Sequence, residues 1–274
     1  MPILHSLPQA PHEGHWLASS MSTFALRSLT KRYGQVFLRR VLLRHPHRLL
    51  LGLLAYRRFL AQESGRGELI PVGVADIEAL WMSAAEAGRR LLVGLGFCQK
   101  PRDNEDWRLA CPAGRFNHDC LYLEGLDADR PSAGLPPLAC QQCAIRTLGT
   151  TALYAGASLY IMTTAMEIAQ DLLLPALTEK RFLTALLALC PYSVEPMALS
   201  LLISGLQAGI ATYDRGACQD YDQWLRADEG DKPECTSLPS EVLGKLLEGL
   251  QWIAKDQRGG RHFRRQGNVY VPCV

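Results

Sequence analysis

The sequence predicts an α/β protein with a small parallel sheet of three or more strands, flanked by helices. In the second half of the chain, compact apolar runs at 158–162, 182–189 and 208–213 alternate with stretches of helical periodicity. This alternation is typical of right-handed parallel βαβ units. Five of the nine cysteines fall between Cys98 and Cys143, in a segment with little periodicity. We therefore expect a Cys-rich loop beside the sheet.

The composition is that of an ordinary globular protein, with 274 residues, 48% hydrophobic and 20% charged side chains. This length suffices for one large domain or two small ones. The first residues do not show the charged start and apolar core of a secretory signal. The longest apolar run, at 49–56, is far shorter than the roughly 20 residues that span a bilayer. We therefore predict a cytoplasmic protein with reduced cysteines and no transmembrane segment.

The first part of the chain is basic. Residues 1–62 contain nine Lys or Arg side chains but a single acid, Glu13. We expect a flexible tail at 1–22 and a basic helical region at 23–90, with helices before and after Pro46. The basic surface indicates an anionic partner, such as a membrane surface or nucleic acid, or else a solvated helix face.

The rest of the chain is expected to form a Cys-rich α/β domain at 91–256, followed by a basic tail at 257–274. A short strand at 91–97 would lead directly into Cys98. The connection at 99–138 is long for a segment without regular structure inside a compact domain, so we expect something to pin it. Metal ligation by cysteines would do so.

Helix starts are predicted at three capping residues. Asp76 precedes a helical pattern before the first strand, and Thr164 and Glu167 have the spacing of a capping box after the run at 158–162. Ser193 follows the second apolar run and can cap a helix that continues to residue 206. An amphipathic last helix is expected at 242–253.

Cysteine ligation is the chemistry that the sequence indicates best. Cys140 and Cys143 form a CxxC chelate, and four thiolates around one centre suit zinc or an iron–sulfur cluster. The intervals between the cysteines match neither a zinc ribbon nor a bacterial ferredoxin. Scattered free or structural cysteines are the alternative. The candidate metal ligands are Cys98, Cys111, Cys120, Cys140, Cys143, Cys190 and Cys218.

The carboxyl ends of the predicted strands form a second candidate location, because ligands collect there in open α/β sheets. Cys190 follows the run at 182–189 and Cys218 lies in the loop after the next run. Cys190 is a ligand, a small buried core residue, or a nucleophile that a helix N-terminus activates. The predicted cofactor-binding or anion-binding residues at this edge are Thr163, Thr164 and Glu195. His118 is a further candidate, as a ligand or proton donor, or else an exposed loop residue.

Several short motifs resemble the family called domain of unknown function one hundred and sixteen. They are Leu95-Gly-Phe-Cys98, Cys111-Pro-Ala, Cys140-x-x-Cys143-x-Ile145, Leu159-Tyr-Ile161, Cys190 and Arg215-Gly-Ala-Cys218. The resemblance covers roughly residues 90 to 220. It implies an α/β domain with a cysteine-bound centre, an iron–sulfur cluster in the first instance, and no established reaction. Two departures are Met162-Thr-Thr164, where the family has a glycine-rich turn, and the segment around His118 and Cys120.

Three functions follow as hypotheses. The first is an iron–sulfur protein with a redox or electron-transfer role, which acts with an unknown redox partner or small molecule. The second is a zinc-stabilised binding or scaffold protein that uses its basic N-terminal surface. The third is a thiol enzyme that uses Cys190. The sequence contains no Gly-rich phosphate motif, nucleophile elbow or HExxH motif.

Overall fold

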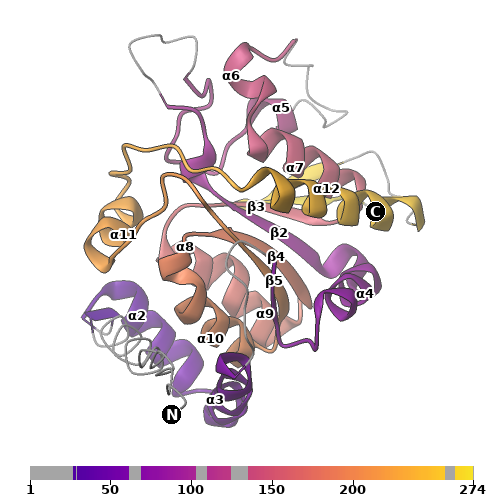
Figure 1. Ribbon diagram of the computed structural model, residues 1–274. Coiled ribbons are helices and arrows are strands. Elements are labelled where there is room, and N and C mark those ends of the chain that lie inside the picture. Colours follow the sequence, from indigo (N-terminus) through magenta and orange to yellow (C-terminus); the bar gives the residue numbers. More distant parts are fainter. Residues whose placement is uncertain are drawn as a thin grey trace, which may run out of the picture.

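The computed structural model confirms the α/β fold, with helices on both faces of a mixed sheet (Figure 1). It describes residues 27–28, 30–61, 69–102, 110–124, 135–256 and 263–273. The strand order in the 7-stranded sheet is β1-β5-β4-β2-β3-β7-β6. The strands are β1 (Ile70–Val72), β2 (Leu91–Gly96), β3 (Ser158–Met162), β4 (Thr184–Leu189), β5 (Gln207–Thr212), β6 (Phe263–Gln266) and β7 (Val269–Pro272).

The centre of the sheet is parallel and its edges are antiparallel. β2 pairs in parallel with both β3 and β4, and β4 pairs in parallel with β5. β1 runs antiparallel to β5 at one edge, and β7 runs antiparallel to β3 near the other. The carboxyl ends of the parallel strands therefore meet at one edge, where ligands usually bind in such sheets.

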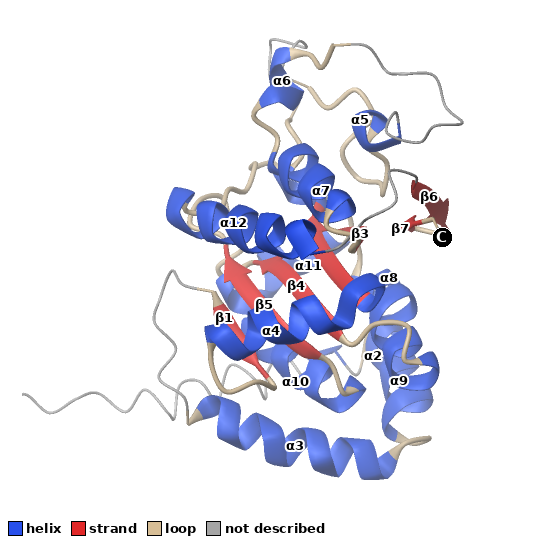
Figure 2. Ribbon diagram, turned by 90° about the vertical axis from the view of Figure 1, so that its right-hand side faces the viewer, coloured by secondary structure: helices blue, strands red, loops and turns tan. Residues whose placement is uncertain are grey.

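Helices cover both faces of the sheet, as Figures 1 and 2 show. α4 (Ile77–Ala87), α7 (Ala144–Tyr154) and α12 (Ser240–Asp256) pack in one core. α3 (Pro46–Leu60), α9 (Leu174–Glu179) and α10 (Val194–Ser204) pack in the other. The shorter helices are α2 (Arg32–Phe37), η1 (Leu38–Leu42), η2 (Gly88–Arg90), η3 (Phe97–Gln99), α5 (Leu121–Glu124), α6 (Leu138–Gln141), α8 (Ala165–Ile168), η5 (Ala169–Leu173), η6 (Pro191–Ser193) and α11 (Tyr221–Asp228).

The central strand β2 is apolar throughout because both of its faces are buried. Leu91, Val93 and Leu95 are buried in the core with α4 and α7, whereas Leu92 is buried in the core with α10. Because successive side chains of a strand point to opposite faces, a strand covered on both faces loses the alternation of polar and apolar residues. The predicted boundary near residue 90 falls between α4 and β2, which share this core.

Two of the three predicted caps are confirmed. The Asp76 side chain accepts from the backbone N–H of Ala79 at 2.8 Å, and the Thr164 hydroxyl accepts from the N–H of Glu167 at 3.2 Å. The third is confirmed only as a helix start. Ser193 stands at the N-cap position of α10, but with φ −92° and ψ −5° it makes no side-chain cap, whereas a capping residue usually has extended φ and ψ.

The C-terminal segment forms structure where we expected a basic tail. β6 and β7 pair with each other, and β7 also pairs with β3, with Leu159 opposite Tyr270. Phe263, Val269 and Tyr270 are buried, so these apolar side chains hold the hairpin on the sheet. The predicted tail at 1–22 lies outside the described residues. Among the helices that the structure describes, none combines the length and apolarity needed to cross a membrane.

Candidate functional site

The predicted cysteine ligands separate into two groups. Cys111, Cys120, Cys140 and Cys143, which we call the loop cluster, lie near enough to one another to interact: burial, and then the neighbouring thiols of this set, raise the pKa of Cys120, Cys140 and Cys143. Cys98, Cys190 and Cys218, which we call the edge group, also interact with one another: Cys190 and Cys218 bond to each other, and both lie near Cys98. All the cysteines are free thiols. The sequence predicted all of these residues as candidate metal ligands; the structure divides them and places Cys120 within the loop cluster.

The loop cluster places two of its sulfurs at helix starts. Cys120 immediately precedes α5, and Cys143 is the residue before α7. The Cys120 sulfur accepts from the backbone N–H groups of the first residues of α5, and the Cys143 sulfur does the same at α7. Such N–H donors stabilise a thiolate. Burial nevertheless dominates, raising the pKa of Cys120 to about 11.

The CxxC turn is held by the helix that follows it. Arg146 of α7 donates through Nε to the carbonyl oxygen of Cys140 at 2.7 Å and through a terminal nitrogen to that of Gln141 at 3.2 Å. Burial raises the pKa of Cys140 to about 11. Because a metal ion displaces thiol protons, these buried neutral thiols would release protons on metal binding.

A buried cation lies beside the loop cluster. Lys100 is only 1% exposed, and its ammonium donates to the carbonyl oxygens of Gly114 (3.1 Å) and Asn117 (2.9 Å) and to the Asn117 side chain. Burial lowers the pKa of Lys100, while Cys111, Cys120 and Cys143 act to raise it. A fixed positive charge at this place would offset part of the charge of several thiolates.

The donor set fits a metal or an iron–sulfur cluster, but the thiols are not arranged around a common centre. Within the described ranges, no group of three or more His, Cys, Asp and Glu side chains is placed to hold a metal ion. The loop cluster supplies four thiols, N–H donors to two of the sulfurs and a compensating ammonium. Ligation would require the segments that carry these thiols to move toward a common centre.

His118 joins the loop to the sheet instead of offering a free ring nitrogen. It is 8% exposed, and its Nδ1 contacts the carbonyl oxygen of Ile161 at 2.7 Å, so this nitrogen carries the proton. Its Nε2 lies 3.3 Å from Oε1 of Glu167 and 3.3 Å from the Thr163 hydroxyl. The ring stacks on Tyr160 at 5.6 Å between centroids. Both nitrogens therefore already have partners within the chain.

The predicted anion site at α8 already contains carboxylates of the chain itself. The hydroxyls of Thr163 and Thr164 donate to Oε2 of Glu167, and the N–H of Ala165 donates to Asp228. Burial raises the pKa of Glu167, but the hydrogen bonds from these hydroxyls and from His118 lower it by a larger amount. The net shift of the Glu167 pKa is therefore downward. A second anion at this helix start would meet like charge.

Glu195 lies between two helices instead of at the thiols. It accepts a hydrogen bond of 3.4 Å from the Tyr56 hydroxyl of α3, and burial raises its pKa. It does not line the cavity at the carboxyl edge. Its predicted role in binding a cofactor therefore gains no support from its position.

The edge group surrounds the carboxyl ends of three adjacent parallel strands. Cys98 follows β2, Cys190 follows β4, and Cys218 lies in the loop after β5. Tyr213 fixes the shape of this edge: its hydroxyl donates to the Ala188 carbonyl at 2.8 Å and accepts from the N–H of Gly96 at 3.1 Å. All the edge-group thiols line a small cavity of about 90 Å³.

Cys190 and Cys218 form a hydrogen-bonded pair. The backbone N–H of Cys218 donates to Sγ of Cys190 at 3.2 Å, and the two thiols also bond to each other. The bond from Cys190 and the nearby Lys232 lower the pKa of Cys218 below its usual range. Donation of its proton to Cys218, together with burial, raises the pKa of Cys190. The bonding arrangement therefore favours Cys218 over Cys190 as the candidate nucleophile, and the hypothesis of a thiol enzyme that uses Cys190 stays untested.

Two further contacts position Cys218 and its lysine. Gly216 has φ +62°, and a Cβ there would lie 2.2 Å from the Cys235 carbonyl oxygen, so only glycine lets the loop before Cys218 pass so close. Arg115 donates to the carbonyl oxygens of Lys232 and Glu234 and to that of Cys98. Sequence reasoning missed the buried Lys100 and Lys232. The one available signal was the position of Lys100 two residues after Cys98.

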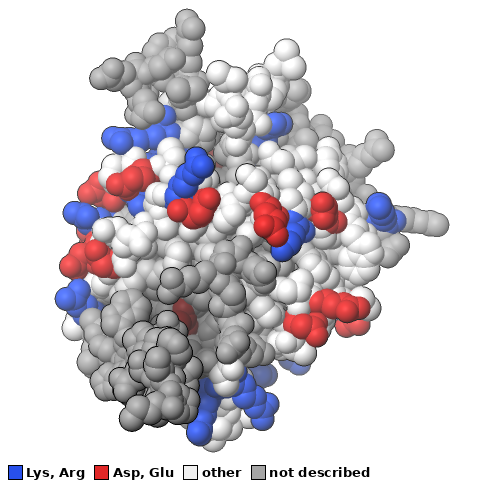
Figure 3. Space-filling view, viewed as in Figure 1, with Lys and Arg blue, Asp and Glu red and all other residues white. Residues whose placement is uncertain are grey.

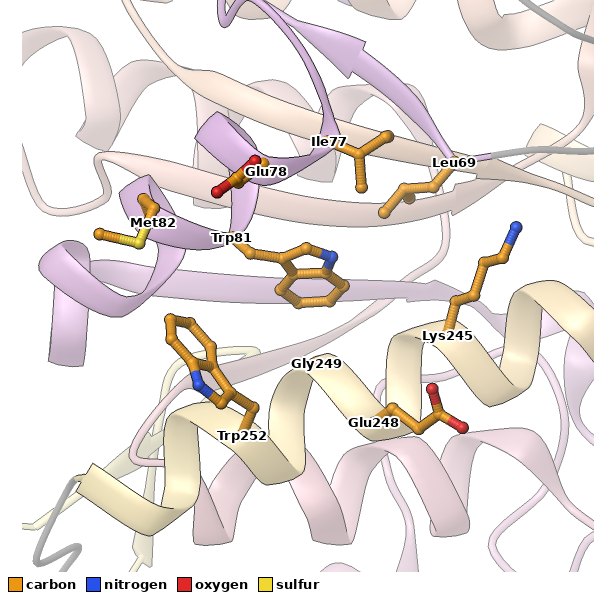
Figure 4. Close-up of a pocket in the computed structure, with 9 residues that line it drawn as sticks. All are labelled: Leu69, Ile77, Glu78, Trp81, Met82, Lys245, Glu248, Gly249 and Trp252. Atoms are coloured by element: carbon orange, nitrogen blue, oxygen red, sulfur yellow. The ribbon is translucent and has the colours of Figure 1, made fainter.

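A larger hollow lies away from both thiol groups. It measures about 690 Å³ between α4 and α12 and is lined by Glu78, Trp81, Lys245, Glu248, Gly249, Trp252 and neighbouring apolar side chains (Figure 4). Gly249 allows the Trp81 ring to pack against α12, because a Cβ there would lie 2.2 Å from that ring. This hollow contains no cysteine.

Comparisons with known proteins identify no relative of this chain. No protein-family model matches the chain, and no curated protein or solved structure shows significant similarity to it. The resemblance to the family called domain of unknown function one hundred and sixteen therefore stays a prediction.

Proposed function

We propose that the chain is a metal-binding protein that holds an iron–sulfur cluster on Cys111, Cys120, Cys140 and Cys143 and has a redox role. The observation that carries this proposal is the gathering of these thiols beside a buried ammonium, Lys100. When bound, such a cluster supplies one-electron transfer. The chain's own residues would bind it, shield it from water and compensate its charge.

The local backbone supports this assignment. N–H groups at the starts of α5 and α7 point to the sulfurs of Cys120 and Cys143, and hydrogen bonds to cluster sulfurs are among the determinants of the reduction potential. An all-thiolate donor set also suits zinc, which is the alternative. The sequence resemblance makes the iron–sulfur cluster our first choice.

The partner would be a redox protein or a small molecule. A basic surface is also present: Arg39, Arg40, Arg57 and Arg58 are exposed on η1 and α3, and basic side chains gather at the lower edge of Figure 3, where Figure 1 places α3. An anionic partner for this surface, such as a membrane surface or nucleic acid, stays a prediction.

The test is to measure metal and sulfide in protein purified without oxygen. We expect iron and inorganic sulfide in comparable amounts, with visible absorption that the double variant Cys140→Ser/Cys143→Ser loses. The matched control is Cys235→Ser, because Cys235 is exposed and belongs to neither group; this variant should retain the full metal content.

Each possible result separates the alternatives. About one zinc per chain without a chromophore, lost in the same double variant, would replace the cluster with the zinc alternative. Protein with neither metal, or a double variant with undiminished metal, would refute the assignment to the loop cluster.

A further inference from the structure

A second kind of chemistry is built into the edge group and does not depend on the loop cluster. The cavity at the carboxyl edge is lined by Cys98, Cys190, Cys218, Tyr213, Trp224 and Lys232, among others. Its volume of about 90 Å³ corresponds to about three water molecules at roughly 30 Å³ each. A space of this size admits a small reagent such as a hydroperoxide.

The two thiols of the pair come from adjacent parallel strands. β4 and β5 are in register up to Leu189 and Thr212, and Cys190 follows β4 directly. The loop after β5 returns so that the N–H of Cys218 bonds to Sγ of Cys190 at 3.2 Å. Because both strands are central and buried, the scaffold holds the two sulfurs together before any reaction.

The charges around the pair differ on its two sides. Lys232 bonds to the Cys218 thiol and, at 3.1 Å, to Glu234. Burial lowers the pKa of Lys232, but Glu234 and the thiols raise it by a larger amount. The net shift is upward, so the Lys232 ammonium stays charged. Cys190 instead faces the neutral thiol of Cys98. Asp228 and Tyr213 are the other titratable groups that line the cavity.

We propose that Cys190 and Cys218 are a peroxide-reactive dithiol, with Cys218 as the attacking sulfur and Cys190 as the resolving one. In the first step the Cys218 thiolate attacks one oxygen of a hydroperoxide and the O–O bond breaks. For hydrogen peroxide, Cys218 becomes a sulfenic acid and hydroxide leaves as water after protonation. The Lys232 ammonium lies where it can stabilise both the thiolate and the departing oxygen.

In the second step the Cys190 sulfur attacks the sulfenic sulfur of Cys218. The S–O bond breaks, the Cys190–Cys218 disulfide forms, and the oxygen leaves with the thiol proton as a second water. Two thiols lose two electrons in total and one peroxide gains them, so the exchange is balanced. A cellular dithiol would return the pair to its reduced form by thiol–disulfide exchange.

The experiment maps the oxidation state of each cysteine by peptide mass spectrometry after treatment with one equivalent of hydrogen peroxide. We expect a disulfide between the peptides that carry Cys190 and Cys218, while the exposed Cys235 stays reduced. In Cys190→Ser, Cys218 should instead be trapped as a sulfenic acid by dimedone. In Cys218→Ser, Cys190 should stay reduced.

Two results would overturn the proposal. One is a wild-type chain whose Cys190 and Cys218 stay reduced while other thiols oxidise. The other is loss of bound metal in Cys190→Ser/Cys218→Ser, which would make the pair a ligand set. The same mapping on Cys140→Ser/Cys143→Ser separates this inference from the proposed function, because the disulfide should still form when the loop cluster no longer binds metal.

Discussion

The loop cluster and the edge group both consist of buried thiols, but the backbone presents their sulfurs in different ways. In the loop cluster, Cys120 and Cys143 stand at helix starts, where N–H groups point to the sulfurs. In the edge group, Cys190 and Cys218 stand after strands; Sγ of Cys190 accepts one N–H bond, from Cys218 itself, and the two thiols bond to each other. Sulfurs that each accept N–H groups from a helix start suit a metal, whereas direct contact between two thiols suits a disulfide.

Each group also has its own buried lysine, and the two lysines have different partners. Lys100 is held by backbone and amide oxygens and affects the loop cluster only through space. Lys232 bonds directly to a thiol of the edge group. A structural role is therefore expected for Lys100 and a chemical one for Lys232. Two predictions test this difference, and a third, on Asp228, tests the burial of the edge group's cavity.

The largest effect is expected for Lys100→Met. The substitution leaves the Gly114 and Asn117 oxygens without their buried donor, which should lower the free energy of unfolding, measured without bound metal, by about 2 to 3 kcal/mol. Urea denaturation measures it. Lys245→Met is the control, because Lys245 forms an exposed pair with Glu241 at 2.9 Å and should cost less than about 0.5 kcal/mol. Equal effects for the two variants would contradict the structural role of Lys100.

A smaller effect concerns Asp228, which lines the cavity of the edge group. Burial raises its pKa to about 6 in the folded protein. Because the folded state then holds the proton more tightly than the unfolded state, this stabilising contribution is present below about pH 4 and is lost as the pH rises through about 6. The loss should amount to about 2 kcal/mol after allowance for partial exposure.

Asp228→Asn is the matched variant, because its amide oxygen can still accept from the N–H of Ala165. Urea denaturation from pH 4 to pH 7 gives the unfolding free energy of both proteins. Between these pH values the wild type should lose about 2 kcal/mol of stability relative to the variant. A difference that does not change with pH would show that Asp228 is not desolvated.

The smallest effect on stability is expected for Lys232→Met, which should act mainly on the oxidation of the Cys190–Cys218 pair. Without the ammonium, the pKa of Cys218 should rise, and peroxide oxidation of the pair near neutral pH should slow about fivefold to tenfold. Stopped-flow or quenched mass mapping gives this rate. Lys232→Arg should retain most of it because the charge is kept. Metal bound at the loop cluster should be unchanged in both variants, and a loss there would couple two groups that we describe as separate.

The α/β class and most of the central elements could be predicted from the sequence. Buried strands covered on both faces appear as continuous apolar runs, so 158–162, 182–189 and 208–213 were recognisable without the fold. Asp76 and Thr164 were recognisable because capping depends on residues close in the chain. The helix start at Ser193 was recognisable too, but its side-chain cap is absent because Ser193 also ends the turn η6. The hairpin of β6 and β7 was missed because its place on β3 depends on pairing over a long sequence distance.

The division of the cysteines into two groups depends on the fold. Cys98 is near Cys111 in sequence, yet it joins Cys190 and Cys218, because β2, β4 and β5 are neighbours in the sheet. Sequence distance does not report such contacts, since strand order is set by packing across the whole domain. The same holds for the charges: Lys232 reaches Cys218 and Lys100 approaches the loop cluster only after folding. The sequence therefore indicated thiol chemistry, and the fold divided it between two places.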